Sequence, residues 1–117
     1  MKKETIKIKS KHYREALNEL SNFLEKNLIG NKIITNGNIA TLLQDMQDYE
    51  LWSFPKKEEL IDEDGKFKNF PIGKYKSKEL WVNPLMRWDD NRILFCDGEN
   101  DDIITEITFI DENDVLI

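Results

Sequence analysis

The sequence is poor in the residues that most often bind metals or act as nucleophiles, with one cysteine, Cys96, and one histidine, His12, among its 117 residues. A single cysteine excludes an internal disulfide and any metal cluster built on several thiolates. A nucleophilic thiolate would need His12 as its base, since the chain has no other imidazole. Cys96 ends the apolar run 93–96, and we therefore interpret it as a small buried core residue.

Long apolar runs and an excess of positive charge are also lacking. No stretch approaches the roughly 20 apolar residues of a membrane-spanning helix, and residues 1–5 lack the apolar core of a signal peptide. We therefore expect an intracellular protein that no signal peptide directs to secretion and that has no membrane partner. The net charge of −6 opposes contacts with phosphate groups, so we also expect no direct binding of nucleic acid.

What the sequence does contain fits a single domain over residues 1–117. Six Phe, three Trp and three Tyr supply large apolar side chains for a core, although charged residues reach 34%. In the simplest interpretation, which we favour, the acidic balance serves solubility. The alternative is an electrostatic role, in which an acidic surface binds a basic protein.

The spacing of apolar residues predicts one long helix and one short helix. The long helix spans residues 13–28, because its apolar side chains recur every three or four positions and share one face. Gly30 suits its C-terminal end. The short helix spans about residues 39–47 and is capped by Thr35 or Asn36. The apolar positions are Tyr13, Leu17, Leu20, Leu24 and Leu28 in the first helix and Ile39, Leu42, Leu43 and Met46 in the second.

Short alternating or β-branched segments predict strands around these helices. Residues 49–54 are also compatible with an extended chain, and the polar stretch 56–78 is interpreted as a surface excursion with a turn at Gly65. The expected strands are residues 5–9, 32–35, 80–82, 93–96 and 103–110, with a further short strand at 115–117. The sequence thus predicts an α+β fold, with one long and one short helix packed on a small mixed β-sheet.

Three groups of acidic residues are candidates for metal binding or acid–base chemistry, and in each case an ordinary turn is the favoured interpretation. Residues 62–65 are similar to the start of a calcium loop, but Lys66 stands where the next oxygen ligand is needed. The clusters at 97–102 and 111–114 carry several carboxylates without a phosphate-binding glycine loop or an electrophile nearby. We therefore expect no metal site, no cofactor and no catalytic residue.

A different composition follows the predicted strand 80–82. Residues 81–92 include two Trp, two Arg and one Met, side chains that are enriched at protein interfaces. Pro84 cannot donate a hydrogen bond to continue the strand, so we expect the chain to turn outward there. The candidate protein-contact residues are Trp81, Met86, Arg87, Trp88 and Arg92. In an equally weighted alternative, both Trp fill the core and the two Arg pair with Asp89 and Asp90.

Several motifs follow one another in order between residues 13 and 110. They are the helix 13–28, the run Gly30-Asn31-Lys32-Ile33-Ile34, the helix 39–46, the approach 70–75, the run Leu80-Trp81-Val82-Asn83-Pro84, residues 90–94 and the turn Asp97-Gly98. This order and its spacing resemble the C-terminal portion of tailed-phage major capsid proteins, especially those of the T-even type. The predicted strand 5–9 has no counterpart in that family.

The resemblance implies a capsid-like domain in a non-enzymatic, phage-type structural protein, which acts by self-association or by docking on a shell. Its partners would then be copies of itself or other shell subunits, and its location would be the host cytoplasm or the virion. The acidic composition supports an alternative from another class, a small immunity or anti-defence inhibitor that blocks a basic nuclease surface. A third hypothesis is a metal-dependent hydrolase that uses the acidic cluster 97–102.

Overall fold

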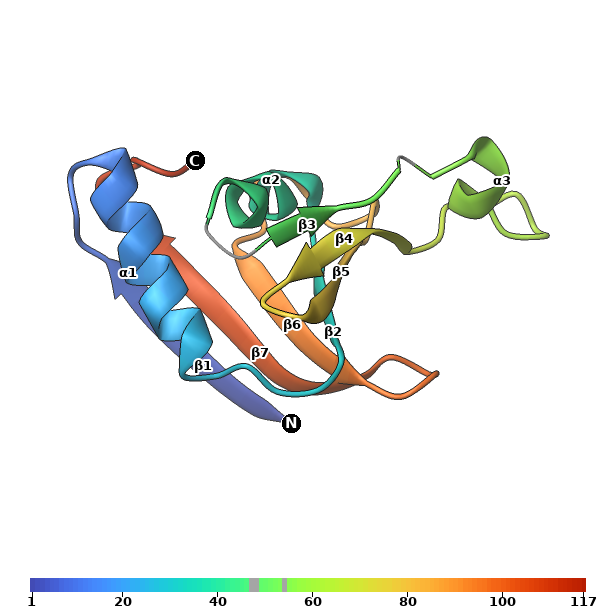
Figure 1. The fold of residues 1–117 in the computed structure, drawn as a ribbon, viewed down its shortest axis with the longest axis horizontal. Coiled ribbons are helices and arrows are strands. Elements are labelled where there is room, and N and C mark those ends of the chain that lie inside the picture. The colour runs from blue at the N-terminus through green and yellow to red at the C-terminus, as the bar shows by residue number, and fades with distance from the viewer. Residues whose placement is uncertain (47–48, 54) are drawn as a thin grey trace.

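Figure 1 shows the fold of the chain in a computed structural model, which describes residues 1–46, 49–53 and 55–117. A β-sheet runs through the described part of the chain, and helices pack against it. Along the chain the elements are β1 (Lys2–Ile8), α1 (Tyr13–Glu25), β2 (Lys32–Thr35), α2 (Gly37–Asp45), β3 (Tyr49–Leu51), α3 (Lys57–Leu60), β4 (Phe70–Tyr75), β5 (Lys78–Val82), β6 (Arg92–Asp97) and β7 (Asp102–Asp111).

The strands of the described residues form one sheet in the order β1-β7-β6-β2-β5-β4-β3. β1 pairs with β7 and β2 pairs with β5 in parallel, whereas the other neighbouring strands are antiparallel. The α+β class and the mixed sheet predicted from the sequence are therefore confirmed. The sheet is larger than predicted, with seven strands, and the described residues form three helices of 13, 9 and 4 residues.

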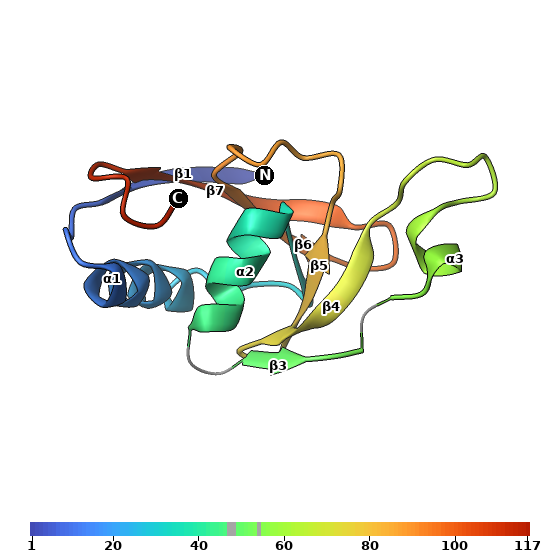
Figure 2. The ribbon, with the colours of Figure 1, turned by 90° about the horizontal axis from the view of Figure 1, so that it is seen from above.

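The hydrophobic core lies between one face of the sheet and the helices α1 and α2, which lie on the same side of it (Figure 2). The strands other than β3, whose three residues are exposed, contribute alternate residues to this face, because successive side chains of a strand point to opposite sides. The helices bury Ala16, Leu17, Leu20 and Leu24 from α1 and Ile39, Ala40, Leu42 and Leu43 from α2. The central strands bury Ile33, Leu80, Val82, Ile93, Phe95, Ile107 and Phe109 against them.

We expect Leu20→Ala to lower the free energy of unfolding by roughly 2–5 kcal/mol, since Leu20 is 0% exposed in the middle of α1 and its truncation leaves a cavity. Urea denaturation followed by circular dichroism measures the change. Glu15→Ala, in the exposed part of the same helix, is the control and should change stability by less than about 0.5 kcal/mol. Equal effects of the two substitutions would contradict the packing of α1.

Trp81 and Arg92 lie on the sheet face opposite the helices. Trp81 alternates with the buried residues Leu80 and Val82 on β5, and Arg92 precedes the buried Ile93 on β6. The register of the pairings β2·β5 and β2·β6 places both side chains on this second face. The alternative prediction, that both Trp fill the core, is therefore wrong, since Trp81 lies half-buried on this second face and Trp88 is exposed. Its other part, that the two Arg pair with Asp89 and Asp90, is confirmed by the ion pairs Arg87–Asp89 and Arg92–Asp90.

Several predicted boundaries differ from the structure. α1 ends at Glu25 instead of residue 28, and Gly30 lies beyond it, in the approach to β2. The short helix runs from Gly37 to Asp45, and the last predicted position, Gln47, is outside the described residues. Within the extended segment predicted at 49–54, β3 covers three residues, and Phe54 is outside the described residues.

Two further predictions of the sequence pattern hold only in part or fail. The polar stretch 56–78 is a surface excursion over residues 56–69, none of which is buried and which include the predicted turn at Gly65, but residues 70–75 form β4, a six-residue strand of the sheet. The segment 115–117 is not a strand; instead the backbone N–H groups of Leu116 and Ile117 donate to the Asp111 carboxylate, at 2.6 and 3.4 Å. In the described part of the chain, no helix has the length and apolar character that crossing a membrane requires.

Candidate protein-contact site

The candidate site is built on residues 83–91, which connect β5 to β6 and are called the Trp88 loop below. Asn83 fixes its beginning: its backbone N–H donates to the Thr35 carbonyl at 2.8 Å, and its side-chain Oδ1 accepts from the Leu85 N–H at 2.9 Å. Met86 N–H donates to the Asn83 carbonyl at 3.2 Å. The chain therefore turns away from the sheet directly after Pro84, as the missing N–H of proline predicts.

Asn36, which is 1% exposed, ties the far end of the Trp88 loop to the beginning of α2. Its Nδ2 lies within hydrogen-bonding distance of the Arg87, Trp88 and Asp90 carbonyl oxygens, at 2.7, 3.2 and 2.9 Å. Its Oδ1 accepts from the backbone N–H of Ile39 at 2.8 Å and so caps α2. One buried amide thus holds both the helix and the loop in place.

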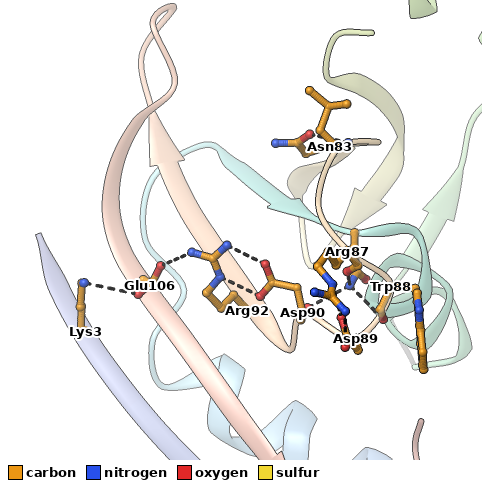
Figure 3. Close-up of polar contacts among 10 residues, drawn as sticks. Lys3, Asn83, Arg87, Trp88, Asp89, Asp90, Arg92 and Glu106 are labelled. Carbon is orange, nitrogen blue, oxygen red and sulfur yellow. Dashed lines mark hydrogen bonds and ion pairs between the residues drawn. The ribbon is translucent and has the colours of Figure 1, made fainter.

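The Trp88 loop presents large apolar and cationic side chains to solvent. Leu85 is 72% exposed and Trp88 is 69% exposed. The side chain of Arg87 is 80% exposed and pairs with Asp89 at 3.2 Å, while Met86 is half-buried. Figure 3 shows the indole of Trp88 extending away from the polar contacts at the base of the loop. Trp and Arg are among the side chains that are enriched at protein contact sites.

Arg92 is part of a polar network at the base of the loop and is less exposed than Arg87 (Figure 3). Its guanidinium donates to both oxygens of Asp90, at 2.7 and 2.6 Å, and to Glu106 at 3.1 Å. The hydrogen bonds from Arg92 hold the pKa of the Asp90 carboxyl below its usual value, although burial acts in the opposite direction. Lys3 of β1 extends the network with a contact to Glu106 at 3.9 Å.

Trp81 is separate from the loop, on β5 and half-buried. The Lys32 ammonium lies 4.2 Å from the centre of its ring, and the same ammonium pairs with Asp101 at 2.8 Å. The five predicted contact residues therefore form two groups. Met86, Arg87 and Trp88 share the loop with Arg92 at its base, whereas Trp81 lies on the second face of the sheet.

A groove of about 600 Å³, called the Trp88 groove below, lies between the loop and the C-terminal residues. It brings together residues of the loop, the start of β6, the end of β7 and the segment after it. They are Trp88, Asp89, Asp90, Asn91, Arg92, Thr108, Phe109, Ile110, Asp111, Asp114 and Ile117. The sequence pattern gave no sign that the acidic turn at 111–114 would lie beside Trp88, because their proximity depends on the antiparallel pairing of β6 with β7.

Some of the acidic residues singled out in the sequence make hydrogen bonds or ion pairs within the chain. Asp62 Oδ1 accepts from the backbone N–H groups of Asp64 and Lys66, both at 2.9 Å, which is an ordinary turn stabilised by an aspartate side chain. In the cluster 97–102, Asp101 pairs with Lys32. Among the described residues, no group of three or more His, Cys, Asp or Glu is arranged to hold a metal ion.

Cys96 is 0% exposed, which confirms its interpretation as a core residue. Burial, and secondarily the nearby carboxylate of Asp101, raise the pKa of its thiol to about 11. The thiol is therefore protonated at neutral pH and a poor nucleophile. His12 is exposed at the N-terminal end of α1 and makes no capping hydrogen bond with its side chain.

The chain matches no protein-family model, no curated protein and no solved structure. The resemblance to tailed-phage capsid proteins therefore depends on the order and spacing of the motifs in the sequence. A functional conclusion has to be drawn from the site itself, namely the exposed Trp88 loop and the groove beside it.

Proposed function

We propose that this protein is a non-enzymatic structural protein of the phage type, with a capsid-like domain that acts by self-association or by docking on a shell of related subunits. Its contact surface is the Trp88 loop. The single observation that carries the proposal is the combination of two large apolar side chains, Leu85 and Trp88, about 70% exposed, with a loop held by a buried asparagine. Such a surface loses little conformational freedom when it binds.

The order of the elements also supports the proposal. A helix, α1, is followed by the Gly30-Asn31 approach to β2, then by α2, the excursion around α3, β4 and β5 with its end at Pro84. In the tailed-phage capsid proteins that the sequence resembles, a long helix, a strand, a short helix and a variable loop precede the second strand in this same order. Gly98, at a φ of +76°, lies in the turn between β6 and β7, where the resemblance expects a glycine turn.

We expect Trp88→Ala to weaken self-association by about 2 kcal/mol or more, roughly 30-fold, because a large aromatic side chain is removed from the proposed interface. Sedimentation velocity over a concentration series measures the association. The free energy of unfolding of the monomer should fall much less, since Trp88 is 69% exposed. Phe67→Ala is the matched control, because Phe67 is also exposed, at 56%, but lies beyond α3.

Unchanged association of the Trp88→Ala protein would contradict the proposed contact surface. A strongly destabilised monomer with unchanged association would place Trp88 in a structural role and favour the second candidate function. Association lost equally in the Trp88→Ala and Phe67→Ala proteins would indicate a general effect of apolar surface rather than an interface at the loop.

The second candidate function is a small acidic inhibitor that blocks a basic nuclease surface. The observation that favours it is the exposed acidic turn between β6 and β7, where Asp97, Glu99 and Asp102 point into solvent in a chain of net charge −6. Such a protein would remain monomeric, and its binding to a basic nuclease would weaken steeply with added salt. Association through the Trp88 loop should depend less on salt, because it buries apolar surface.

A further inference from the structure

We propose that the Trp88 groove binds the guanidinium group of an arginine side chain, which a protein partner presents. This inference rests on the proposed function, because it names the chemistry of the partner that meets the Trp88 loop. The groove has a volume of about 600 Å³, which is ample for one extended side chain. Its charge, its unpaired acceptors and its apolar walls each favour this occupant.

The groove is negatively charged. Four carboxylates line it, from Asp89, Asp90, Asp111 and Asp114, against the single cation Arg92. Arg92 is already bound by Asp90 within the groove and by Glu106 outside its lining. The remaining charge attracts a cation and repels an anionic ligand.

Two oxygen atoms of the groove lining are buried without a hydrogen-bond partner among the described residues, Asn91 Oδ1 and Asp111 Oδ1. Phe109 N–H donates to the Asn91 carbonyl at 3.0 Å, which sets Asn91 opposite Phe109 and two positions from Asp111 along the neighbouring strand. Asp111 Oδ2, in contrast, accepts from the Leu116 N–H. Buried acceptors without a donor are unfavourable, so a ligand with several N–H groups that enters the groove and displaces the atoms covering these two oxygens would supply their missing donors.

The walls of the groove distinguish arginine from lysine. The indole of Trp88 is 69% exposed at one side, and Ile110 and Ile117 contribute aliphatic surface. A guanidinium is planar, stacks on an aromatic face and carries five N–H donors in a fixed arrangement. An ammonium is compact and strongly hydrated, and it can donate to fewer acceptors at once. The aliphatic stem of the arginine would pack along the two isoleucines.

The test is a titration of the ¹⁵N-labelled protein with N-acetyl-arginine amide, followed by NMR at the Trp88 indole N–H and the Asn91 side-chain amide. We expect saturable shifts at both groups, with a Kd on the order of 1 mM for a single side chain. N-acetyl-citrulline amide, which has nearly the same shape without the charge, should cause no saturable shift. N-acetyl-lysine amide should bind at least about fivefold more weakly.

Two variants test the groove, and a third is the control. Trp88→Leu removes the aromatic face, and Asp114→Asn removes one carboxylate. The backbone φ of residue 114 is 50°, a conformation that asparagine tolerates. Each should raise the Kd for N-acetyl-arginine amide about tenfold. Asp64→Asn changes the net charge equally but lies in the turn after α3, and it should leave the Kd unchanged.

The proposal is overturned if N-acetyl-citrulline amide causes saturable shifts of the same resonances, or if N-acetyl-lysine amide binds as tightly as N-acetyl-arginine amide. It is overturned as well if Asp64→Asn weakens the binding of N-acetyl-arginine amide as much as Asp114→Asn does. It is also overturned if the shifts do not saturate. The titration reports on the groove whether or not the protein associates with itself. If N-acetyl-arginine amide binds but Trp88→Ala leaves self-association unchanged, the proposed contact surface is rejected and the arginine site is supported. If Trp88→Ala weakens self-association but N-acetyl-arginine amide does not bind, the arginine site alone is rejected.

Discussion

Asn36→Ala is expected to lower the free energy of unfolding by about 2–5 kcal/mol, one of the largest losses that a single substitution of a polar side chain should cause here. The substitution removes the cap of α2 and also the donor shared by the Arg87, Trp88 and Asp90 carbonyls. Loss of a helix cap accounts for roughly 0.5–2 kcal/mol, and the Asp90 carbonyl left without a donor for roughly 1–3 kcal/mol. The Arg87 and Trp88 carbonyls keep a donor each, in the Asp90 N–H and the Asn38 side chain. Urea denaturation measures the sum.

Asn36→Asp separates these two contributions. It keeps a side-chain oxygen that can accept from Ile39 N–H, but it replaces the donor by a carboxylate facing three carbonyl oxygens. Burial and the carbonyl dipoles should raise the pKa of this new carboxyl in the folded state above its unfolded value of about 3.9. A carboxyl with a raised pKa in the folded state contributes its full stabilisation of that state at a pH below the unfolded pKa. This contribution is lost as the pH rises through the folded pKa. The deficit relative to the native protein should therefore shrink as the pH falls.

The control for both substitutions is Asn38→Ala. Asn38 donates a single exposed hydrogen bond to the Trp88 carbonyl at 2.9 Å, so its loss should cost less than about 1 kcal/mol. If Asn38→Ala were as destabilising as Asn36→Ala, the loop would not depend on the buried amide. A deficit in Asn36→Asp that does not change with pH would show that the new carboxyl is not held against the carbonyls.

Asn36 also illustrates how far a sequence pattern carries. The apolar spacing after it predicts α2, and its position before the helix makes it one of two candidate caps, of which the structure selects Asn36. Its second role, in binding the loop some 50 residues later, has no local signal. A side chain that holds two distant segments is visible only when both are folded, because the sequence records neighbours along the chain and not across it.

The sequence pattern does not predict the strand β4, and the reason is local and physical. Its residues Phe70–Tyr75 include Pro71 and Gly73, which the propensity scale counts against a strand. The structure accommodates them through an irregularity in the β4·β5 register between Pro71 and Gly73. A Cβ at position 73 would overlap the Glu50 carbonyl of β3, so glycine is required where two backbones approach closely. Tertiary context here overrides propensity.

In the candidate site, too, some features can be predicted from the sequence and others depend on the folded structure. Pro84 predicts that the chain leaves the sheet, and the structure places residues 85–90 outside any strand. The grouping of Trp81 with the loop residues was a matter of sequence proximity, and the alternation along β5 instead turns Trp81 to the second sheet face. The role of these residues as protein contacts stays a prediction. The acidic wall of the Trp88 groove depends on the pairing of β6 with β7, which no spacing within one segment reveals.

Gly30→Ala is expected to be as severe as Asn36→Ala, with a loss of about 3–5 kcal/mol, for a different reason. Gly30 lies at the entry to β2 with a φ of +77°, a region that costs other residues roughly 1–2 kcal/mol. A Cβ there would also overlap the carbonyl oxygen of Cys96 on β6. That carbonyl cannot easily move away, because it accepts from the Asn31 N–H at 3.0 Å and belongs to a central strand of the sheet.

Gly98→Ala isolates the backbone contribution from the steric one. Gly98 has nearly the same φ, +76°, but a Cβ at position 98 would meet no atom within 4 Å. Its substitution should therefore cost only the roughly 1–2 kcal/mol of the left-handed conformation. We expect urea denaturation to show Gly30→Ala at least about 2 kcal/mol less stable than Gly98→Ala, the difference being the cost of forcing β2 away from β6. Equal losses would mean that the approach of Gly30 to the Cys96 carbonyl places no steric demand on this position, and that its positive φ alone requires glycine.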